Sequence, residues 1–116
     1  RLPGVQFRPM SARTADVPQP LLVVASVQAF LATPLLHEEL FGPAVTVVLC
    51  DSESQLASVL RAVTGSLTVT LWGADSPGAL AQTLVRDAMQ RAGRVLFGGM
   101  PTGVAVTRAQ HHGGPW

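Results

Sequence analysis

The chain has 116 residues, of which 47% are hydrophobic and only 13% charged, and its formal net charge is +1. Disordered chains combine low hydrophobicity with high net charge, and nucleic-acid binders with a basic face carry a strong positive charge, so neither class fits. A membrane-spanning helix needs about 20 consecutive apolar residues, and the longest apolar run of this kind, Leu21 to Ala25, is far shorter. The single cysteine, Cys50, excludes an internal disulfide.

Two strands are predicted in the first half of the chain. Residues 1–20 are rich in proline and are expected to form an extended lead-in. The run Leu21–Ala25 and the β-branched run Ala44–Cys50 predict strands buried on both faces. Between them, Val27–Ala32 is expected to form a helical turn or two, followed by a loop that ends at Pro43.

A helix and a third strand are predicted next. Ser52 and Gln55 fit a capping box, and apolar residues then recur at helical spacing at positions 56, 59, 60 and 63. Gly65 stands where this helix would end. Leu67–Leu71 alternates with a period of two, which predicts a third strand.

A second helix and a fourth strand complete the pattern. Ser76 followed by Pro77 is typical of a helix start. The apolar stripe of this helix consists of Leu80, Leu84, Val85, Ala88 and Met89. Gly93 is expected to end the helix, Arg94–Phe97 to form a short strand, and residues 99–116 to form a loop-rich tail.

The alternation of strands and helices predicts an α/β fold with a mostly parallel sheet and helices on its faces. We expect residues 1–116 to form a single partial domain. Two helices do not suffice to cover both faces of such a sheet, and the charged fraction lies well below the average of about 25%. The expectation is therefore that part of the covering structure lies outside this chain.

Few residues suggest chemistry by type and spacing. His111 and His112 are adjacent and have no further ligands at suitable spacing, so no metal site is expected. Cys50 ends an apolar strand, where an inert thiol is usual. The glycines at positions 98, 99 and 103 lack the lysine of a phosphate-binding loop.

The acidic stretch from Glu38 to Pro43 attracts more interest. Glu38 and Glu39 precede an aromatic residue, Phe41, and a Gly-Pro pair, between two predicted strands. A solvated loop with ordinary turn residues is one interpretation. The other is a ligand site beyond the carboxyl ends of the strands, where a carboxylate accepts hydrogen bonds from sugar hydroxyls and a phenyl ring packs on a flat heterocycle.

The motif Glu-Glu-Leu-Phe-Gly-Pro, followed by an apolar strand and a capped helix, resembles the NAD(P)-dependent aldehyde dehydrogenase superfamily. The resemblance implies a late segment of the catalytic domain. The tail, residues 94–104 and 112–116, is similar to the branch that contains bacterial α-ketoglutarate semialdehyde and fatty aldehyde dehydrogenases. Gly98 departs from that pattern, because relatives often have asparagine there.

The resemblance implies roles for several residues. Glu39 matches the glutamate that holds the nicotinamide ribose hydroxyls, and Phe41 matches the aromatic residue beside the nicotinamide. Glu38 matches the motif without a ligand role. A substrate-proximal location near the aldehyde pocket is implied for Met100, Pro101, Thr102 and Gly103.

In this family a cysteine attacks the aldehyde, hydride passes to the cofactor, and a glutamate-activated water hydrolyses the resulting thioester. The resemblance places that cysteine and the general base before Arg1, and Cys50 does not match the cysteine. No catalytic residue is therefore assigned here, and the chain by itself is expected to be inactive. The cofactor is NAD or NADP, and only the branch resemblance favours NADP slightly.

The expected partners are a small-molecule aldehyde, the rest of the parent polypeptide and further copies of it in a homo-oligomer. The parent protein is expected to be bacterial and cytoplasmic. Neither nucleic acid nor a membrane is an expected partner. The chain on its own is expected to self-associate through apolar surface or open sheet edges. The alternative is a stand-alone small α/β binding or interaction module. Its low charge would reflect a homo-oligomer interface, and its acidic loop would hold no ligand.

Overall fold

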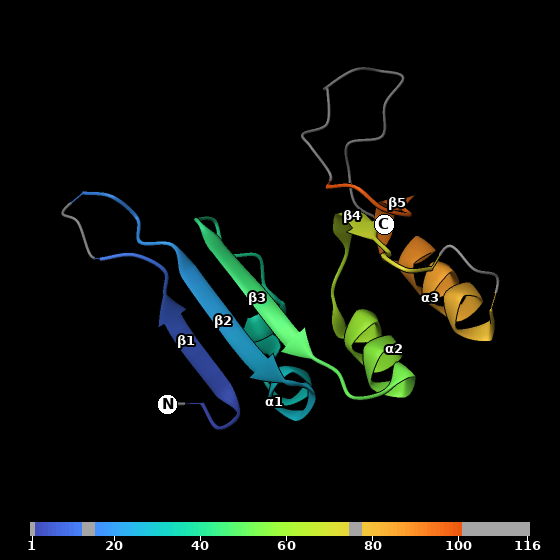
Figure 1. Cartoon of the computed structure of the whole chain (residues 1–116), viewed down its shortest axis with the longest axis horizontal. Coiled ribbons are helices and arrows are strands. Elements are labelled where there is room, and N and C mark those ends of the chain that lie inside the picture. Colours follow the sequence, from blue (N-terminus) through green and yellow to red (C-terminus); the bar gives the residue numbers. More distant parts are fainter. Residues whose placement is uncertain (1, 13–15, 75–77, 101–116) are drawn as a thin grey trace, which may run out of the picture. The chain divides into compact units, whose positions relative to one another are not determined.

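A computed structural model describes residues 2–12, 16–74 and 78–100. The chain divides into two compact units, Arg1–Val59 and Leu60–Trp116, and each is described by itself (Figure 1). Among the described helices, none combines the length and the apolar character that a membrane crossing requires.

The first unit contains a three-stranded mixed sheet in the order β1-β2-β3. Strand β2 (Leu21–Ser26) pairs in parallel with β3 (Ala44–Leu49), so both predicted strands are confirmed. Strand β1 (Val5–Pro9) pairs antiparallel with β2 and lies within the lead-in, where no strand was predicted. It is an edge strand and ends at Pro9, and a sheet edge is where proline is tolerated.

A short helix covers one face of this sheet. Helix α1 (Val27–Ala32) follows β2 directly, and the N–H of Ala29 donates to Oγ of Ser26, the N-cap residue, at 3.2 Å. The buried side chains of α1 pack against the residues of β2 that point to the same side of the sheet. Residues of both elements form this core and are at most 5% exposed: Val23 and Ala25 of β2, and Val27 and Phe30 of α1.

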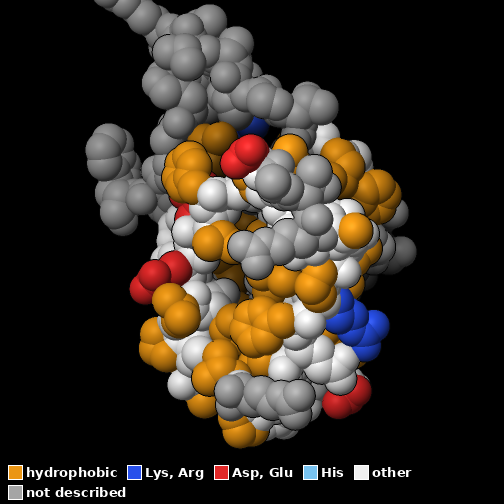
Figure 2. Space-filling model, turned by 90° about the vertical axis from the view of Figure 1, so that its left-hand side faces the viewer, with side chains coloured by type: hydrophobic (Ala, Val, Ile, Leu, Met, Phe, Trp, Pro, Cys, Tyr) orange, Lys and Arg blue, Asp and Glu red, His pale blue; other side chains and the backbone are white. Residues whose placement is uncertain are grey.

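The opposite face of the sheet is largely open within this unit. Leu22 and Val24 are half-buried, and the register places them beside Val45 and Val47 of β3, which are 56% and 38% exposed. Leu49 on the same face is 62% exposed. Figure 2, seen from the side of β1, shows many hydrophobic side chains at the surface, with acidic and basic ones toward the margins of the view. The prediction that β3 is buried on both faces is therefore wrong for the described residues, because no described element of this unit covers it.

The second unit is a parallel strand pair with a helical crossover. Strands β4 (Ser66–Thr70) and β5 (Ala92–Leu96) pair in parallel, and α3 (Ala79–Met89) connects them and packs against β5. Leu84 and Ala88 of the predicted apolar stripe are buried. The described strands thus form two sheets, one mixed and one parallel, with helices beside them, and the predicted α/β class is confirmed.

Helix α2 (Glu53–Ala62) connects β3 with β4 and begins as the sequence predicts. The N–H of Gln55 donates to Oγ of Ser52 at 3.3 Å, and the N–H of Asp51 donates to Oε1 of Gln55 at 2.8 Å. The glutamine amide thus reaches the residue before the cap, a small variation on the capping box.

Helix α3 differs from the prediction at both ends. It begins at Ala79 with Gly78 as its N-cap residue, and the predicted start at Ser76 and Pro77 lies outside the described residues. It ends at Met89, and Gly93 lies inside β5, so the prediction that this glycine ends the helix is wrong. A turn that precedes β5 closes the helix instead, through a hydrogen bond from the N–H of Arg91 to the carbonyl of Ala88.

Candidate functional site

The acidic loop is anchored to the core of the first unit at its start. A short 3-10 helix, η1 (Pro34–His37), precedes the loop. Nε2 of His37 lies 2.8 Å from the carbonyl oxygen of Phe30, so this nitrogen carries the proton and donates. The two rings also pack together, with centroids 4.4 Å apart and planes tilted by 42°. Phe30 is a core residue and is only 4% exposed. Its contacts hold His37 in place, and the loop begins at the next residue.

The loop is anchored to the sheet at its end. The carbonyl of Pro43 accepts a hydrogen bond from the N–H of Leu21 at 2.9 Å, beside the first residue pair of the β2–β3 ladder. The N–H of Ala44 donates to the carbonyl of Gly42 at 2.8 Å, which closes a tight turn before β3. The five residues between His37 and Pro43 therefore form a short loop with both ends held by the unit.

The side chains between the anchors point to solvent. Glu38, Glu39, Leu40 and Phe41 are all exposed, and Phe41 is exposed to 94%. Within the described part of the chain, neither carboxylate takes part in a hydrogen bond or ion pair. An ionised carboxylate accepts hydrogen bonds at two oxygens and suits a pair of neighbouring hydroxyls. A free phenyl ring offers a face to a planar ring, so these residue types fit a sugar and a flat heterocycle.

The position of this loop in the sheet differs from the prediction. Leu21 is the first residue of β2 and Ala44 the first residue of β3, so Gly42 and Pro43 lie at the amino ends of the parallel strands. The expectation of a site at the carboxyl ends is therefore wrong. The physical reason is that α1 and η1 form the crossover that a parallel pair requires, and they carry the chain back before the loop begins.

The other predicted site residues lie in the second unit or outside the described residues. Met100 follows β5 and is 81% exposed. Gly98 and Gly99 precede it with φ angles of 127° and 76°, which favour glycine. Pro101, Thr102 and Gly103 lie outside the described residues, so their predicted location near the substrate stays a prediction.

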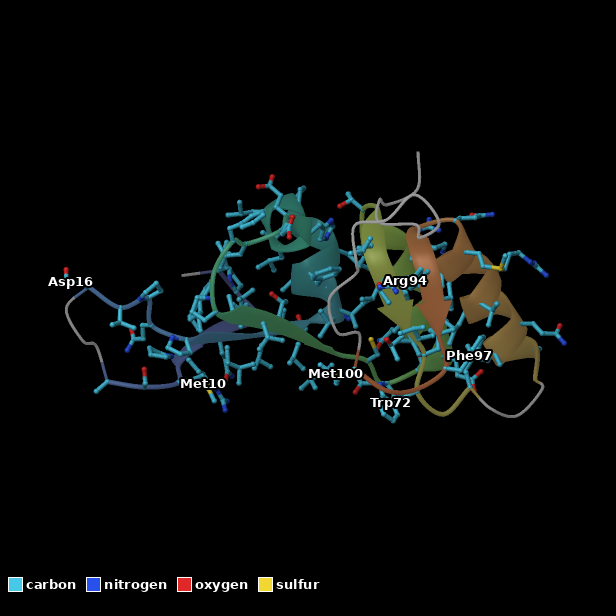
Figure 3. The ribbon with its side chains drawn as sticks, turned by 90° about the horizontal axis from the view of Figure 1, so that it is seen from above. Met10, Asp16, Trp72, Arg94, Phe97 and Met100 are labelled. Atoms are coloured by element: carbon cyan, nitrogen blue, oxygen red, sulfur yellow. The ribbon has the colours of Figure 1, made fainter. Side chains whose placement is uncertain are left out.

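Trp72 is the most exposed of the aromatic residues that the motif and the predicted elements did not single out. It lies two residues after the end of β4 and is 70% exposed. A Cβ atom built on Gly98 would lie 4.0 Å from Cζ3 of its indole ring. Figure 3 shows Trp72, Phe97 and Met100 near the carboxyl end of the parallel pair of β4 and β5. The available signal was a large aromatic residue between a predicted strand and Gly73.

Cys50 lies at the end of β3 and is a poor nucleophile. Partial burial raises the pKa of its thiol above the usual value, and the neighbouring carboxylate of Asp51 raises it further. Both effects keep the thiol protonated at neutral pH, whereas thiolate is the reactive form. In the ranges that the structure covers, no three His, Cys, Asp or Glu side chains gather as metal ligands would. His111 and His112 lie outside these ranges.

No family model matches the chain. Two curated proteins resemble it over most of its length. It is 43% identical over 95 residues to α-ketoglutaric semialdehyde dehydrogenase 2 of Azospirillum brasilense, which is 82% of the chain and 18% of that protein. It is 40% identical over 99 residues to α-ketoglutaric semialdehyde dehydrogenase of Acinetobacter baylyi, which is 84% of the chain and 19% of that protein.

The chain is therefore homologous to a segment of aldehyde dehydrogenases, as its motif indicated. Within that family, both relatives are α-ketoglutaric semialdehyde dehydrogenases. The chain spans about a fifth of the length of these relatives.

Proposed function

We propose that this chain forms part of an NAD(P)-dependent aldehyde dehydrogenase, which oxidises an aldehyde to a carboxylic acid through a cysteine thioester. The observation that carries the proposal is the identity of 43% and 40% to two semialdehyde dehydrogenases over more than four fifths of the chain. The acidic loop supports it, because the loop presents the carboxylate and phenyl groups that a nicotinamide riboside needs.

The proposed role of this chain is to orient the cofactor. The dinucleotide, when bound, supplies the acceptor for the hydride of the aldehyde. Glu39 accepts hydrogen bonds from the ribose hydroxyls, and Phe41 packs beside the nicotinamide. The anchors at His37 and Pro43 hold the backbone of this loop, so less conformational freedom is lost when the ligand binds. NAD and NADP both fit this role, and the slight preference for NADP rests on the branch resemblance alone.

We also propose that the chain alone does not oxidise aldehydes. Its single cysteine is Cys50, and the raised pKa of this thiol opposes the formation of a thiolate. The active protein is then a longer polypeptide that assembles as a cytoplasmic homo-oligomer, and this chain contributes one segment to it.

The experiment compares Glu39→Gln with Glu38→Gln in a full-length polypeptide that carries this chain. Both changes remove one exposed charge from the same loop, so they form a matched pair. Glu39→Gln should lower kcat/KM for the cofactor about tenfold, because a hydrogen bond to a charged group is lost. Glu38→Gln should stay within about twofold of the parent.

The isolated chain, assayed with NAD and NADP and several aldehydes, should show no turnover. Equal effects of the two glutamate substitutions would refute the role of Glu39. Sustained turnover by the isolated chain would refute the proposal that this chain alone does not oxidise aldehydes.

A further inference from the structure

We infer that a pocket at the carboxyl ends of β2 and β3 receives a lysine or arginine side chain, which pairs with Asp51. The basic side chain belongs to a segment of the parent polypeptide that covers the open face of this sheet. The inference rests on the proposed function, because it requires the longer polypeptide proposed above. Its site is separate from the acidic loop, which lies at the amino ends of the same strands.

The first support is a pocket in the first unit with a volume of about 420 Å³. Gln6 of β1, Val24 and Ser26 of β2, Leu49 at the end of β3, and Asp51 contribute to its lining. Residues that pair across neighbouring strands share a face of the sheet, and the register pairs Val24 with Gln6 and Ser26 with Leu49. Helix α1 packs on the alternate residues of β2, so this pocket lies on the open face.

The second support is the apolar wall of the pocket. Leu49 is 62% exposed and Val24 is half-buried, so a segment that covers them buries further apolar surface. Lysine and arginine side chains pack their methylene stems on apolar surface and keep their charged ends at its edge. A basic side chain therefore fits a pocket with an apolar wall and the exposed carboxylate of Asp51 at its edge.

The third support is the charge of the pocket. Among the described residues that line it, Asp51 alone carries an ionisable side chain. The N–H of Asp51 donates to Gln55, but within the described ranges its carboxylate takes part in no hydrogen bond or ion pair. Arg8 lies on the same face, and its Nη2 donates to Oε1 of Gln6 at 2.6 Å. The carboxylate of Asp51 is therefore available to a partner from outside this unit.

Covering the open face makes a cation favourable at this point. A segment that packs on Val24 and Leu49 removes water from the pocket and from one side of Asp51. An ionised carboxylate that loses hydration without gaining a partner costs much free energy, and a charge-assisted hydrogen bond from a basic side chain offsets this cost. An apolar side chain would leave the charge unpaired, and an acidic one would repel it. The pocket therefore selects a basic side chain.

The first measurement tests the pocket in this chain alone. The probe n-butylammonium has the stem and charge of a lysine side chain, and 1-butanol lacks the charge. Saturation-transfer NMR should show saturable binding of n-butylammonium with a dissociation constant of about 10 mM, and 1-butanol should bind about tenfold more weakly. Asp51→Asn should weaken ammonium binding about tenfold. Glu53→Gln should leave it within about twofold, because Glu53 is equally exposed and only two residues away but lies outside the pocket.

The second measurement identifies the occupant in the full-length polypeptide that carries this chain. There the covering segment should already fill the pocket, so n-butylammonium should show no binding that depends on Asp51. Asp51→Asn should lower the thermal midpoint of the full-length protein by about 2–4 °C, because one ion pair is lost. In this chain alone, the same substitution should shift the midpoint by less than about 1 °C, because the partner is absent. Glu53→Gln should have an equally small effect in both proteins.

The inference is overturned if n-butylammonium does not bind this chain, if the substitutions at Asp51 and Glu53 have equal effects, or if Asp51→Asn leaves the midpoint of the full-length protein unchanged. Binding of n-butylammonium to the full-length protein through Asp51 would also overturn it, because the pocket would then take a free ammonium compound. These measurements involve no cofactor and no turnover. Failure of the Glu39 experiment alone would therefore count against the cofactor contact, and failure of the Asp51 experiments alone would count against this pocket.

Discussion

The hydrogen bond and ring contact between His37 and Phe30 should stabilise the first unit and define the start of the acidic loop. His37→Ala removes the donor at 2.8 Å from the carbonyl of Phe30 and the ring at 4.4 Å from its phenyl group. The lost hydrogen bond is worth about 1 kcal/mol, and the lost ring contact about 0.5–1.5 kcal/mol. We expect the free energy of unfolding to fall by about 2 kcal/mol.

Urea denaturation, followed by circular dichroism, measures this change. For a small domain with a slope of about 2 kcal/mol/M, the midpoint should fall by about 1 M. A protease that cleaves after glutamate provides a second readout at Glu38 and Glu39. Cleavage there should be faster in His37→Ala, because the loop has lost one of its two anchors.

Leu35→Ala serves as the control. Leu35 lies in the same 3-10 helix and is 68% exposed, so its truncation should change stability by no more than about 0.5 kcal/mol. The reasoning is refuted if His37→Ala has the same small effect, or if both variants are cleaved at the parent rate.

Three further predictions concern other parts of the first unit. Gly4→Ala should destabilise the chain by about 1–3 kcal/mol in urea denaturation, because φ is +74° and a Cβ would lie 2.8 Å from the hydroxyl of Ser26. Gly42→Ala should not destabilise it, because a Cβ at Gly42 would meet no atom within 4 Å, and equal effects of the two substitutions would contradict this. Cys50 should react with iodoacetamide more slowly than free cysteine at neutral pH and faster as the pH rises, because burial and Asp51 raise its pKa; a fast reaction at neutral pH would count against this. The isolated chain should self-associate in sedimentation velocity at high concentration, and Val45→Lys should reduce this association, since this exposed residue lies on an edge strand; a strictly monomeric parent chain would contradict it.

The candidate site rests partly on a short motif and partly on contacts that no motif contains. The roles of Glu39 and Phe41 are implied by the resemblance of their motif and stay predictions, and the structure leaves both side chains exposed in a loop with fixed ends. The contribution of His37 could not be predicted, because it depends on a contact with a residue seven positions earlier, across the end of α1. Trp72 was missed for a similar reason, since its neighbour Gly98 is distant in the sequence.

The sequence by itself determined the local elements of this protein. The apolar runs of β2 and β3, the cap of α2 and the stripe of α3 follow from residue types at short spacing, and such patterns act within one element.

The tertiary structure alone decided how these elements pair and where they end. It placed β1 against β2, brought the acidic loop to the amino ends of the parallel strands, and put Gly93 inside β5. It also left one face of β3 exposed within its unit. The physical reason is that strand pairing and burial are contacts between residues far apart in the chain, and local periodicity shows that an apolar face exists without showing what covers it.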